Sequence, residues 1–121
     1  MVTYKLLYFM SYEILELLLE DGTSPYAEWF NSLDPLAAAK ISVAKVRMEL
    51  GNLSNVEWFR GIGECKIDWG PGYRIYLAKD GLRILILLGG GTKKRQQKDI
   101  DKAIELFEGY KQRKAGTKKG K

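Results

Sequence analysis

The sequence predicts a single α+β domain, in which a helical hairpin and a C-terminal helix pack against a mostly antiparallel, four-stranded sheet. A length of 121 residues suits one hydrophobic core, and a content of 45% hydrophobic and 29% charged residues is typical of a packed globular protein. The spacing of hydrophobic residues changes from a helical period to a period of two near the middle of the chain, and it returns to a helical period near the end. This order of periods predicts one strand, two helices, the remaining strands and one last helix.

The first half of the chain predicts the first strand and the helical hairpin. Tyr12 to Leu19 is a strand-like apolar run that ends before a turn. Ser24-Pro25 and Asp34-Pro35 each join an N-cap residue to a proline at the first helical position, which predicts two helix starts. Gly51-Asn52 is a stop signal for the second helix.

The second half predicts the rest of the sheet and the closing helix. Ile62 to Trp69 alternates polar and apolar residues, a Gly-Pro-Gly turn follows, and Tyr73 to Lys79 forms the returning strand. Leu82 to Leu88 is apolar on both faces, which is typical of a central strand covered on both sides. After three glycines, the closing helix carries one apolar stripe, formed by Ile100, Ala103, Ile104, Phe107 and Tyr110.

The ends of the chain are predicted to lie outside this core. We assign residues 1–110 to the domain, with residues 1–10 as an N-terminal extension, and residues 111–121 to a basic, flexible tail. Met10 is an alternative start, which would leave the first nine residues outside the protein. Val2 to Leu19 contains charged residues and has no basic leader, so it predicts neither a signal peptide nor a membrane span. The single Cys65 has no disulfide partner in the chain, and a cytoplasmic location is therefore expected.

Charge and composition narrow the possible partners and chemistry. The net charge is -4 over residues 1–59, +6 over residues 60–98 and +3 over residues 99–121, which favours a polyanion as the partner of the middle segment. The sequence contains no histidine, which excludes histidine-dependent triads and nucleases with paired imidazoles. It also argues against a zinc site of His and Cys, so we predict no metal and no cofactor. Catalysis would have to use Lys, Arg, Tyr, Asp or Glu.

A polar patch is predicted on one face of the hairpin around Gly-Pro-Gly. Glu64 and Lys66 share a face of the first strand, and Arg74 and Tyr76 share a face of the second, so the hairpin can bring all four together. Cations for phosphates and an aromatic ring for an unstacked base suit RNA binding. The alternative is an exposed sheet face with cross-strand ion pairs such as Glu64 to Arg74.

A second cationic cluster, Thr92-Lys93-Lys94-Arg95-Gln96, follows the three glycines. Cations at a helix start oppose the helix dipole, so we expect the cluster to serve a phosphate, gripped by backbone N–H groups, Lys93 and Arg95. The glycine run alone lacks the spacing of a nucleotide-binding loop, and the lysines could instead solvate a loop. Lys40, Lys45 and Arg47 are expected to be mainly solvated, and the three tryptophans are expected in the core: Trp29, Trp58 and Trp69.

Taken together, several spaced motifs resemble the addiction-module killer proteins, a branch of the RelE/HigB-like toxin superfamily. The resemblance covers about residues 11–110, and its most specific part is the Gly-Pro-Gly-Tyr-Arg block followed by Gly-Gly-x-Lys-x-x-Gln. The chain departs from that family at three positions, with Thr92 where aspartate is usual, Cys65 where leucine is common and Lys66 where arginine is common. The motifs that carry the resemblance are Gly51-Asn52, Gly61 to Ile67, Gly70 to Tyr76, Leu87 to Lys93, Gln96, Asp99 and Ile100.

The resemblance implies a RelE-like fold and a toxin that cleaves mRNA on the ribosome, neutralised by a helix-turn-helix antitoxin. In such enzymes the 2'-hydroxyl attacks the adjacent phosphorus, which leaves a 2',3'-cyclic phosphate and a 5'-hydroxyl. The alternatives are a non-catalytic RNA-binding module, an inactive toxin that still binds an antitoxin, and a structural domain that binds no RNA.

Roles for the candidate residues follow as hypotheses. Arg74 is the main cation for the transition state, and Lys93 with Arg95 holds a phosphate. Lys66 or Glu64 is the candidate base. Further candidates for RNA contact are Tyr76, which would stack a base, Gln96, which would orient a phosphate or sugar, Lys94 and Arg47.

Overall fold

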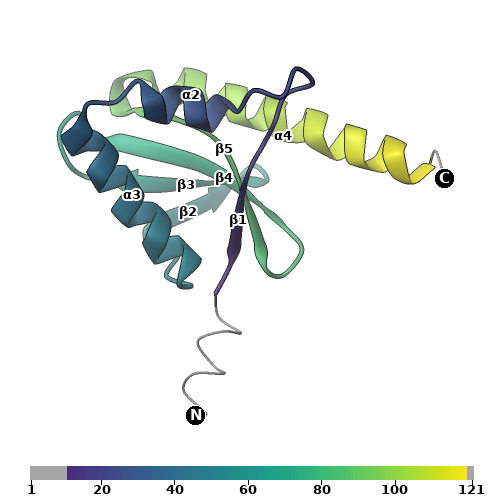
Figure 1. The fold of residues 1–121 in the computed structure, drawn as a ribbon, viewed down its shortest axis with the longest axis horizontal. Coiled ribbons are helices and arrows are strands. Elements are labelled where there is room, and N and C mark those ends of the chain that lie inside the picture. The colour runs from purple at the N-terminus through teal and green to yellow at the C-terminus, as the bar shows by residue number, and fades with distance from the viewer. Residues whose placement is uncertain (1–10, 120–121) are drawn as a thin grey trace, which may run out of the picture.

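The computed structural model describes residues 11–119 and has an α+β fold with five strands and three α-helices in that part of the chain (Figure 1). The strands lie in one sheet in the order β1-β5-β4-β3-β2. The elements in chain order are β1 (Glu13–Glu16), α2 (Pro25–Asn31), α3 (Pro35–Glu49), β2 (Val56–Phe59), β3 (Ile62–Ile67), β4 (Tyr73–Asp80), β5 (Ile84–Thr92), the short 3-10 helix η1 (Lys93–Arg95) and α4 (Gln96–Lys119).

The sheet has one strand more than the four predicted. Residues 56–59 form the separate edge strand β2, which pairs antiparallel with β3 through a tight turn at Arg60-Gly61, where both residues have positive φ. β1 is shorter than the predicted strand from Tyr12 to Leu19 and pairs parallel with β5, whereas all other pairs are antiparallel. The parallel pair is possible because the two helices after β1 carry the chain across the sheet.

Both predicted helix starts are confirmed. The Ser24 side chain accepts a hydrogen bond from the Ala27 backbone N–H at 3.0 Å, and the Asp34 carboxylate accepts one from the Ala37 backbone N–H at 2.9 Å. In each helix a proline follows the cap, where its missing N–H costs nothing. The hairpin of α2 and α3 is therefore set by local sequence.

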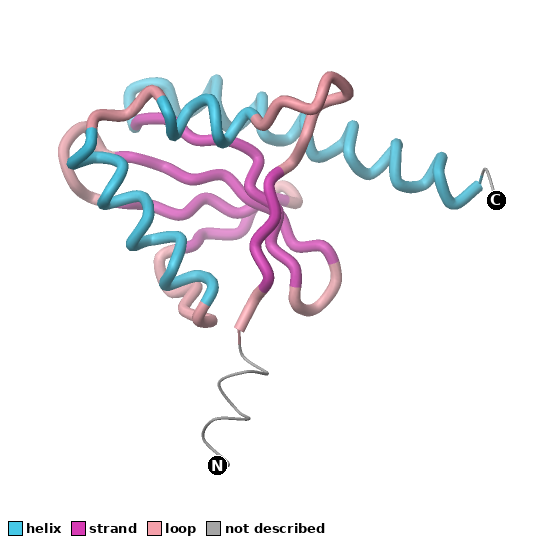
Figure 2. Tube along the Cα trace, in the orientation of Figure 1, coloured by secondary structure: helices cyan, strands magenta, loops and turns pink. Residues whose placement is uncertain are grey.

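The sheet is covered on both faces, as the apolar central strand predicts. Figures 1 and 2 show α2 and α3 on one face and α4 behind the other. Leu85 and Leu87 of β5 lie in the core beneath α2 and α3, whereas Ile86 and Leu88 lie in the core beneath α4. The side chains of β4 also alternate between the two cores, and Ile75 faces the core beneath α2 and α3.

The last segment of the chain is helical where a flexible tail is predicted. α4 continues to Lys119, and in Figure 1 its C-terminal part extends beyond the sheet. The Tyr110 hydroxyl and the Lys114 ammonium both bond to the Asp80 carboxylate, at 2.6 and 2.7 Å, which ties this part of the helix to the end of β4.

The predicted extension, residues 1–10, lies outside the described residues. No helix of residues 11–119 is both long and apolar enough to cross a membrane.

The tryptophans are less buried than predicted. Trp29 and Trp69 are partly buried against the core beneath α2 and α3, but Trp58 on the edge strand β2 is 42% exposed, so its assignment to the core is wrong. The Lys79 ammonium lies 5.0 Å from the centre of the Trp58 ring, and this contact covers the ring without burying it. Cys65 is buried, and burial raises the pKa of its thiol to about 11.

Candidate functional site

The predicted hairpin places its four polar residues on one face of the sheet. In the register between β3 and β4, Glu64 lies opposite Tyr76 and Lys66 lies opposite Arg74. Tyr76 belongs to the core beneath α4, and Arg74, two residues earlier, points to the same face. The start of α4 therefore covers much of the predicted patch.

Glu64 is the centre of a buried hydrogen-bond network. Its side chain is almost fully buried and accepts a hydrogen bond from the Tyr76 hydroxyl at 3.1 Å. The Gln96 amide donates to both of its oxygens, at 3.1 and 2.8 Å. The Arg74 Nε atom lies 3.8 Å from the same carboxylate. The predicted ion pair of Glu64 with Arg74 is thus present, but it is buried rather than exposed.

Arg74 is buried with part of its hydrogen-bonding capacity unused. The residue is 5% exposed, and its Nη1 atom donates a long bond of 3.4 Å to the Tyr73 carbonyl. Within residues 11–119 the Nε atom has no hydrogen-bond partner. A guanidinium has five N–H donors in a rigid fork, and a buried donor without an acceptor is costly. The guanidinium therefore has donor capacity left for a further acceptor, such as a phosphate oxygen.

The cations after β5 stand beside Arg74. The Lys93 backbone N–H donates to the Gly72 carbonyl at 2.8 Å, which fixes the start of η1 against the turn before β4. A Cβ atom at Gly72 would lie 3.3 Å from the Lys93 Cβ atom and 3.6 Å from the Arg74 Nη1 atom, so these three residues are close neighbours. The side chains of η1 are exposed: Lys93, Lys94 and Arg95. Exposed cations and the buried guanidinium therefore meet at one end of β4.

The glycines before this cluster do not form the predicted loop. Gly89 to Gly91 lie inside β5, and the Lys93 N–H already bonds to Gly72 rather than pointing at a free anion site. A side chain at Gly90 would overlap the indole of Trp29, and one at Gly91 would overlap the Asp99 carboxylate. Close packing, rather than a flexible phosphate-binding loop, requires glycine here.

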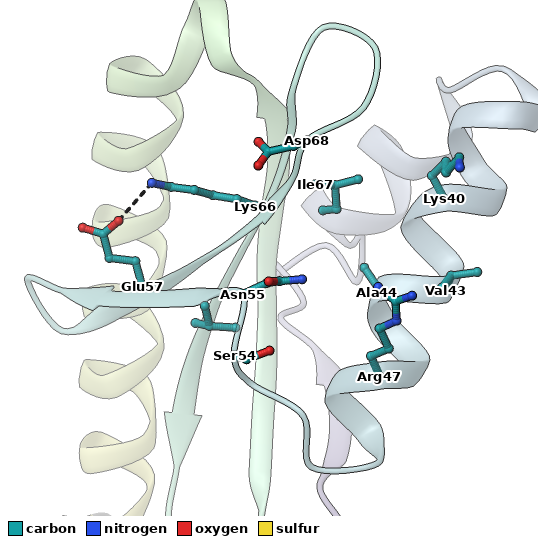
Figure 3. A pocket seen from close by; sticks show the side chains of 11 residues that line it. Lys40, Val43, Ala44, Arg47, Ser54, Asn55, Glu57, Lys66, Ile67 and Asp68 are labelled. Carbon is teal, nitrogen blue, oxygen red and sulfur yellow. Dashed lines mark hydrogen bonds and ion pairs between the residues drawn. The ribbon is translucent and has the colours of Figure 1, made fainter.

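Lys66 and Arg47 lie differently relative to Arg74. Lys66 is the cross-strand neighbour of Arg74, but its ammonium reaches toward the edge strand β2. The Lys66 ammonium forms an ion pair with Glu57 at 3.0 Å on the edge strand, and both side chains are well exposed. Arg47 lies on α3, against the other face of the sheet, where it lines a groove of about 560 Å³ with Lys40. In Figure 3, Lys66 and Glu57 point away from α3, and the dashed line marks their contact. The structure does not bring Arg47 to the patch around Arg74.

Tyr76 does not offer a ring on which a base can stack. It is 1% exposed, and its hydroxyl is held by Glu64. Burial and the nearby Glu64 charge raise the pKa of Tyr76, which keeps the phenol protonated as a donor. The stacking assignment is wrong because α4 covers this face of β4.

We expect Tyr76→Phe to lower the free energy of unfolding by about 1–2 kcal/mol, because Glu64 loses a buried hydrogen bond while the ring keeps its packing. Urea denaturation followed by circular dichroism measures this change. The matched control is Tyr12→Phe, at a partly buried tyrosine beneath α2 and α3. Unchanged stability in Tyr76→Phe would show that the hydroxyl does not hold the network together.

Asp99 is a further acid in the same cluster. Its Oδ2 atom is buried and has no hydrogen-bond partner in the described part of the chain. Burial raises the pKa of Asp99, and the nearby Arg95 charge opposes that shift. Because the folded protein holds this proton more tightly than the unfolded chain does, Asp99 contributes stability below its ordinary pKa of 3.8, and this contribution is lost as the pH rises through the folded value.

The resulting expectation is that Asp99→Asn raises the free energy of unfolding at pH 7 and not at pH 3, since the amide removes an ionised carboxylate from a buried position. Urea midpoints at the two pH values test this. Asp101→Asn is the control, because Asp101 is exposed and makes only surface contacts, an ion pair with Arg60 at 3.7 Å and a hydrogen bond from the Gln97 side chain at 3.1 Å. A gain of the same size in both variants, or at both pH values, would contradict the assignment to Asp99.

Comparison with known proteins finds a relative of this chain. Neither a family model nor a solved structure matches the chain. A Haemophilus influenzae protein named "Uncharacterized protein" is 40% identical over 83 residues, which are 67% of this chain and 84% of the relative. The chain belongs to the same family as this Haemophilus protein. The relative's name states no activity, so the function of this family has to be argued from the site.

The sequence predicted most residues of the polar cluster around Glu64 and Arg74, but it assigned no role to Asp99. Asp99 follows Gln96 by three residues in the first turn of α4, a spacing that places both side chains on one helix face, toward β4 and β5. This three-residue spacing is the sequence feature that could have assigned Asp99 to the cluster. Within residues 11–119, no three acidic or cysteine side chains lie close enough together to hold a metal ion.

Proposed function

We propose that the chain is the toxin of a type II toxin-antitoxin pair, an endoribonuclease that cleaves mRNA on the ribosome and thereby stops translation and growth. The observation that carries the proposal is the buried Arg74 guanidinium, whose Nε atom is ion-paired with Glu64 at 3.8 Å but makes no hydrogen bond in the described part of the chain, beside the exposed cation of Lys93. The motif resemblance to RelE/HigB-like toxins supports the same function. In this proposal the partners are mRNA and a helix-turn-helix antitoxin, and the protein works in the cytoplasm.

The reaction suits a site built from cations. The 2'-oxygen forms a bond to the adjacent phosphorus, the bond from phosphorus to the 5'-oxygen breaks, and the products are a 2',3'-cyclic phosphate and a 5'-hydroxyl. A base takes the proton of the 2'-hydroxyl, and the leaving 5'-oxygen gains a proton. No cofactor is needed because the RNA supplies its own nucleophile. The negative charge that grows on the phosphorane is what preorganised cations stabilise most.

Each member of the cluster has a role in this proposal. Arg74 contacts the charged phosphorane, and Lys93 with Arg95 holds the phosphate from the solvent side. Glu64 is a positioning residue, since its carboxylate already accepts bonds from Tyr76 and Gln96 and lies beside Arg74. The exposed Lys66 is then the remaining candidate for the base, and it must give up its proton and its ion pair with Glu57 to act as one. Because Arg74 is 5% exposed, RNA must displace the η1 turn to reach it.

A second function is favoured by a different observation. Arg74 and Tyr76 are buried and Lys66 is paired with Glu57, which leaves Lys93, Lys94 and Arg95 as the exposed cations of the site. Such a surface suits a non-catalytic RNA-binding module, or an inactive toxin that still binds its antitoxin.

One experiment separates the two functions. The chain is expressed from an inducible promoter, and the 5' ends of cellular mRNA are mapped before and after induction. The proposed nuclease creates new 5'-hydroxyl ends together with growth arrest, whereas a binding module creates none. Lys45→Ala is a matched control, because it removes a cation from α3 on the other face of the sheet. New ends with Lys45→Ala and none with Lys93→Ala would support the proposal, and equal cleavage by both variants would oppose it.

A further inference from the structure

The outer face of α3 carries an exposed apolar stripe. Its large members are between 50% and 60% exposed, although the helix is packed and well formed: Leu36 60%, Val43 51%, Val46 50% and Leu50 59%. The opposite face of the same helix is buried through Ala37, Ile41 and Met48. The helix therefore has two apolar faces, and only one of them is covered within the described part of the chain. Exposed apolar patches of this kind mark interaction surfaces.

The spacing of the stripe is that of a helix-packing seam. Leu36, Val43 and Leu50 follow one another at intervals of seven residues, and Ala39 and Val46 fall three residues after the first two. Positions a and d of a heptad have this spacing, and they present a continuous seam to a partner helix. The 15 residues of α3 span about 22 Å at a rise of about 1.5 Å per residue, long enough for two heptads of contact. The geometry fits a helix better than an extended peptide.

The charged residues beside the seam indicate which kind of partner helix would fit. With Leu36 at position a, Lys40 and Arg47 both fall at position e and flank the stripe on one side. The other flank, position g, holds Ser42 and Glu49. Arg47 makes no ion pair within the described part of the chain, and the Lys40 ammonium lies 5.5 Å from the centre of the Trp69 ring rather than beside a carboxylate. An antiparallel second copy would bring these cations opposite those of its neighbour, which is unfavourable. Acidic residues on the partner would neutralise both.

A groove continues the seam toward the sheet. It has a volume of about 560 Å³, and α3 supplies one wall through Lys40, Val43, Ala44 and Arg47 (Figure 3). The other wall comes from the segment around β2 and the end of β3, and it carries Lys66 together with the carboxylates of Glu57 and Asp68. Val43 belongs to both the stripe and the groove, so acidic side chains beside the seam can meet Lys40 and Arg47 on the wall that α3 forms.

We propose that the outer face of α3 binds an amphipathic helix of a partner protein whose apolar heptad seam is flanked by acidic residues. This surface lies on the other face of the sheet from the Glu64 and Arg74 cluster. The inference stands on α3 alone and does not depend on RNA cleavage. A partner bound here leaves the Lys93 side of the molecule open.

The test uses a synthetic three-heptad peptide with Leu at positions a and d and Glu at the flanking positions, and a second peptide with Lys in place of Glu. Binding of each labelled peptide to the full chain is measured by fluorescence anisotropy. We expect the Glu peptide to bind, the Lys peptide to bind at least about tenfold more weakly, and Val46→Asp to weaken the Glu peptide by about tenfold or more. Because Val46 is exposed, this variant should keep its fold and any RNA cleavage. Leu82→Asp is the matched control, since Leu82 is 94% exposed in the turn after β4.

The charge of the seam is tested separately by reversal. Arg47→Glu combined with Lys40→Glu should favour the Lys peptide over the Glu peptide. Equal binding of both peptides to the unaltered chain, or Glu-peptide binding that Val46→Asp leaves unchanged, would overturn the proposal. Sedimentation of the chain alone supplies the remaining outcome: a dimer that Val46→Asp dissociates would mean that a second copy, and not an acidic helix, occupies the stripe.

Discussion

Arg74→Lys is expected to lower the rate of RNA cleavage by about 100-fold or more while the protein stays folded, which is the range seen when one preorganised donor to a transition-state charge is removed. The substitution keeps a positive charge next to Glu64, so the buried carboxylate is not left without its counter-charge. It removes the planar fork, including the Nε donor that has no partner in the described part of the chain. The measurement is the single-turnover rate on a ribosome-bound message, with thermal unfolding of each variant alongside.

The control for the Arg74→Lys prediction is the replacement of another arginine by lysine, far from the site. Arg113→Lys changes an exposed arginine in the C-terminal part of α4, far along the helix from Gln96, and should leave the rate unchanged. Lys93→Ala provides a second reading at an exposed position, where misfolding is not expected, and it should weaken RNA binding. Full cleavage by Arg74→Lys and by Lys93→Ala would remove the basis of the proposed nuclease.

Gly90→Ala is expected to destabilise the fold by about 2–3 kcal/mol, as overpacking of a well-packed core does. A Cβ atom at this position would overlap the indole of Trp29. The indole has little room to withdraw, because its ring lies 5.8 Å from Tyr26 and 6.5 Å from Tyr73 between ring centres. The urea midpoint of the purified protein measures the effect.

Two variants make the stability prediction specific to the Trp29 contact. Gly116→Ala, in α4, adds the same methyl group where nothing lies within 4 Å, and it should leave stability unchanged or raise it slightly. Gly90→Ala together with Trp29→Leu should recover part of the loss, since the smaller side chain gives the new methyl group space. If Gly90→Ala unfolds at the same urea concentration as the unaltered protein, glycine at position 90 does not serve packing.

Local sequence predicted much of the architecture for identifiable reasons. Ser24-Pro25 and Asp34-Pro35 start helices where the structure has them, because a cap and a proline act within one helical turn. The apolar run after Asp80-Gly81 is a strand covered on both faces, as its composition predicts. The parallel partner of β1 was missed, since pairing between distant segments leaves little trace in either segment alone. β2 is a local hairpin partner of β3, and its four residues were not counted as a separate strand.

The candidate site was likewise predicted in part by local sequence and decided in part by the tertiary structure. Alternation along β3 and β4 was enough to place Glu64, Lys66, Arg74 and Tyr76 on one face, because a strand has a period of two. Alternation carries no information on which helix later covers that face. The start of α4 does so, and the resulting burial turns Tyr76 from a stacking ring into a hydrogen-bond donor. It also turns the expected surface ion pair of Arg74 into a buried one.

The sequence by itself therefore determined the fold class, the helix starts, the absence of imidazole chemistry and the cationic character of residues 60–98, because these depend on composition and on neighbours within a few positions. Only the tertiary structure decided the parallel pairing of β1 with β5, the burial of Arg74 and the packing role of Gly90 and Gly91. It also decided which of the two apolar faces of α3 is left uncovered. These features depend on which segments, far apart in the chain, come to lie against one another.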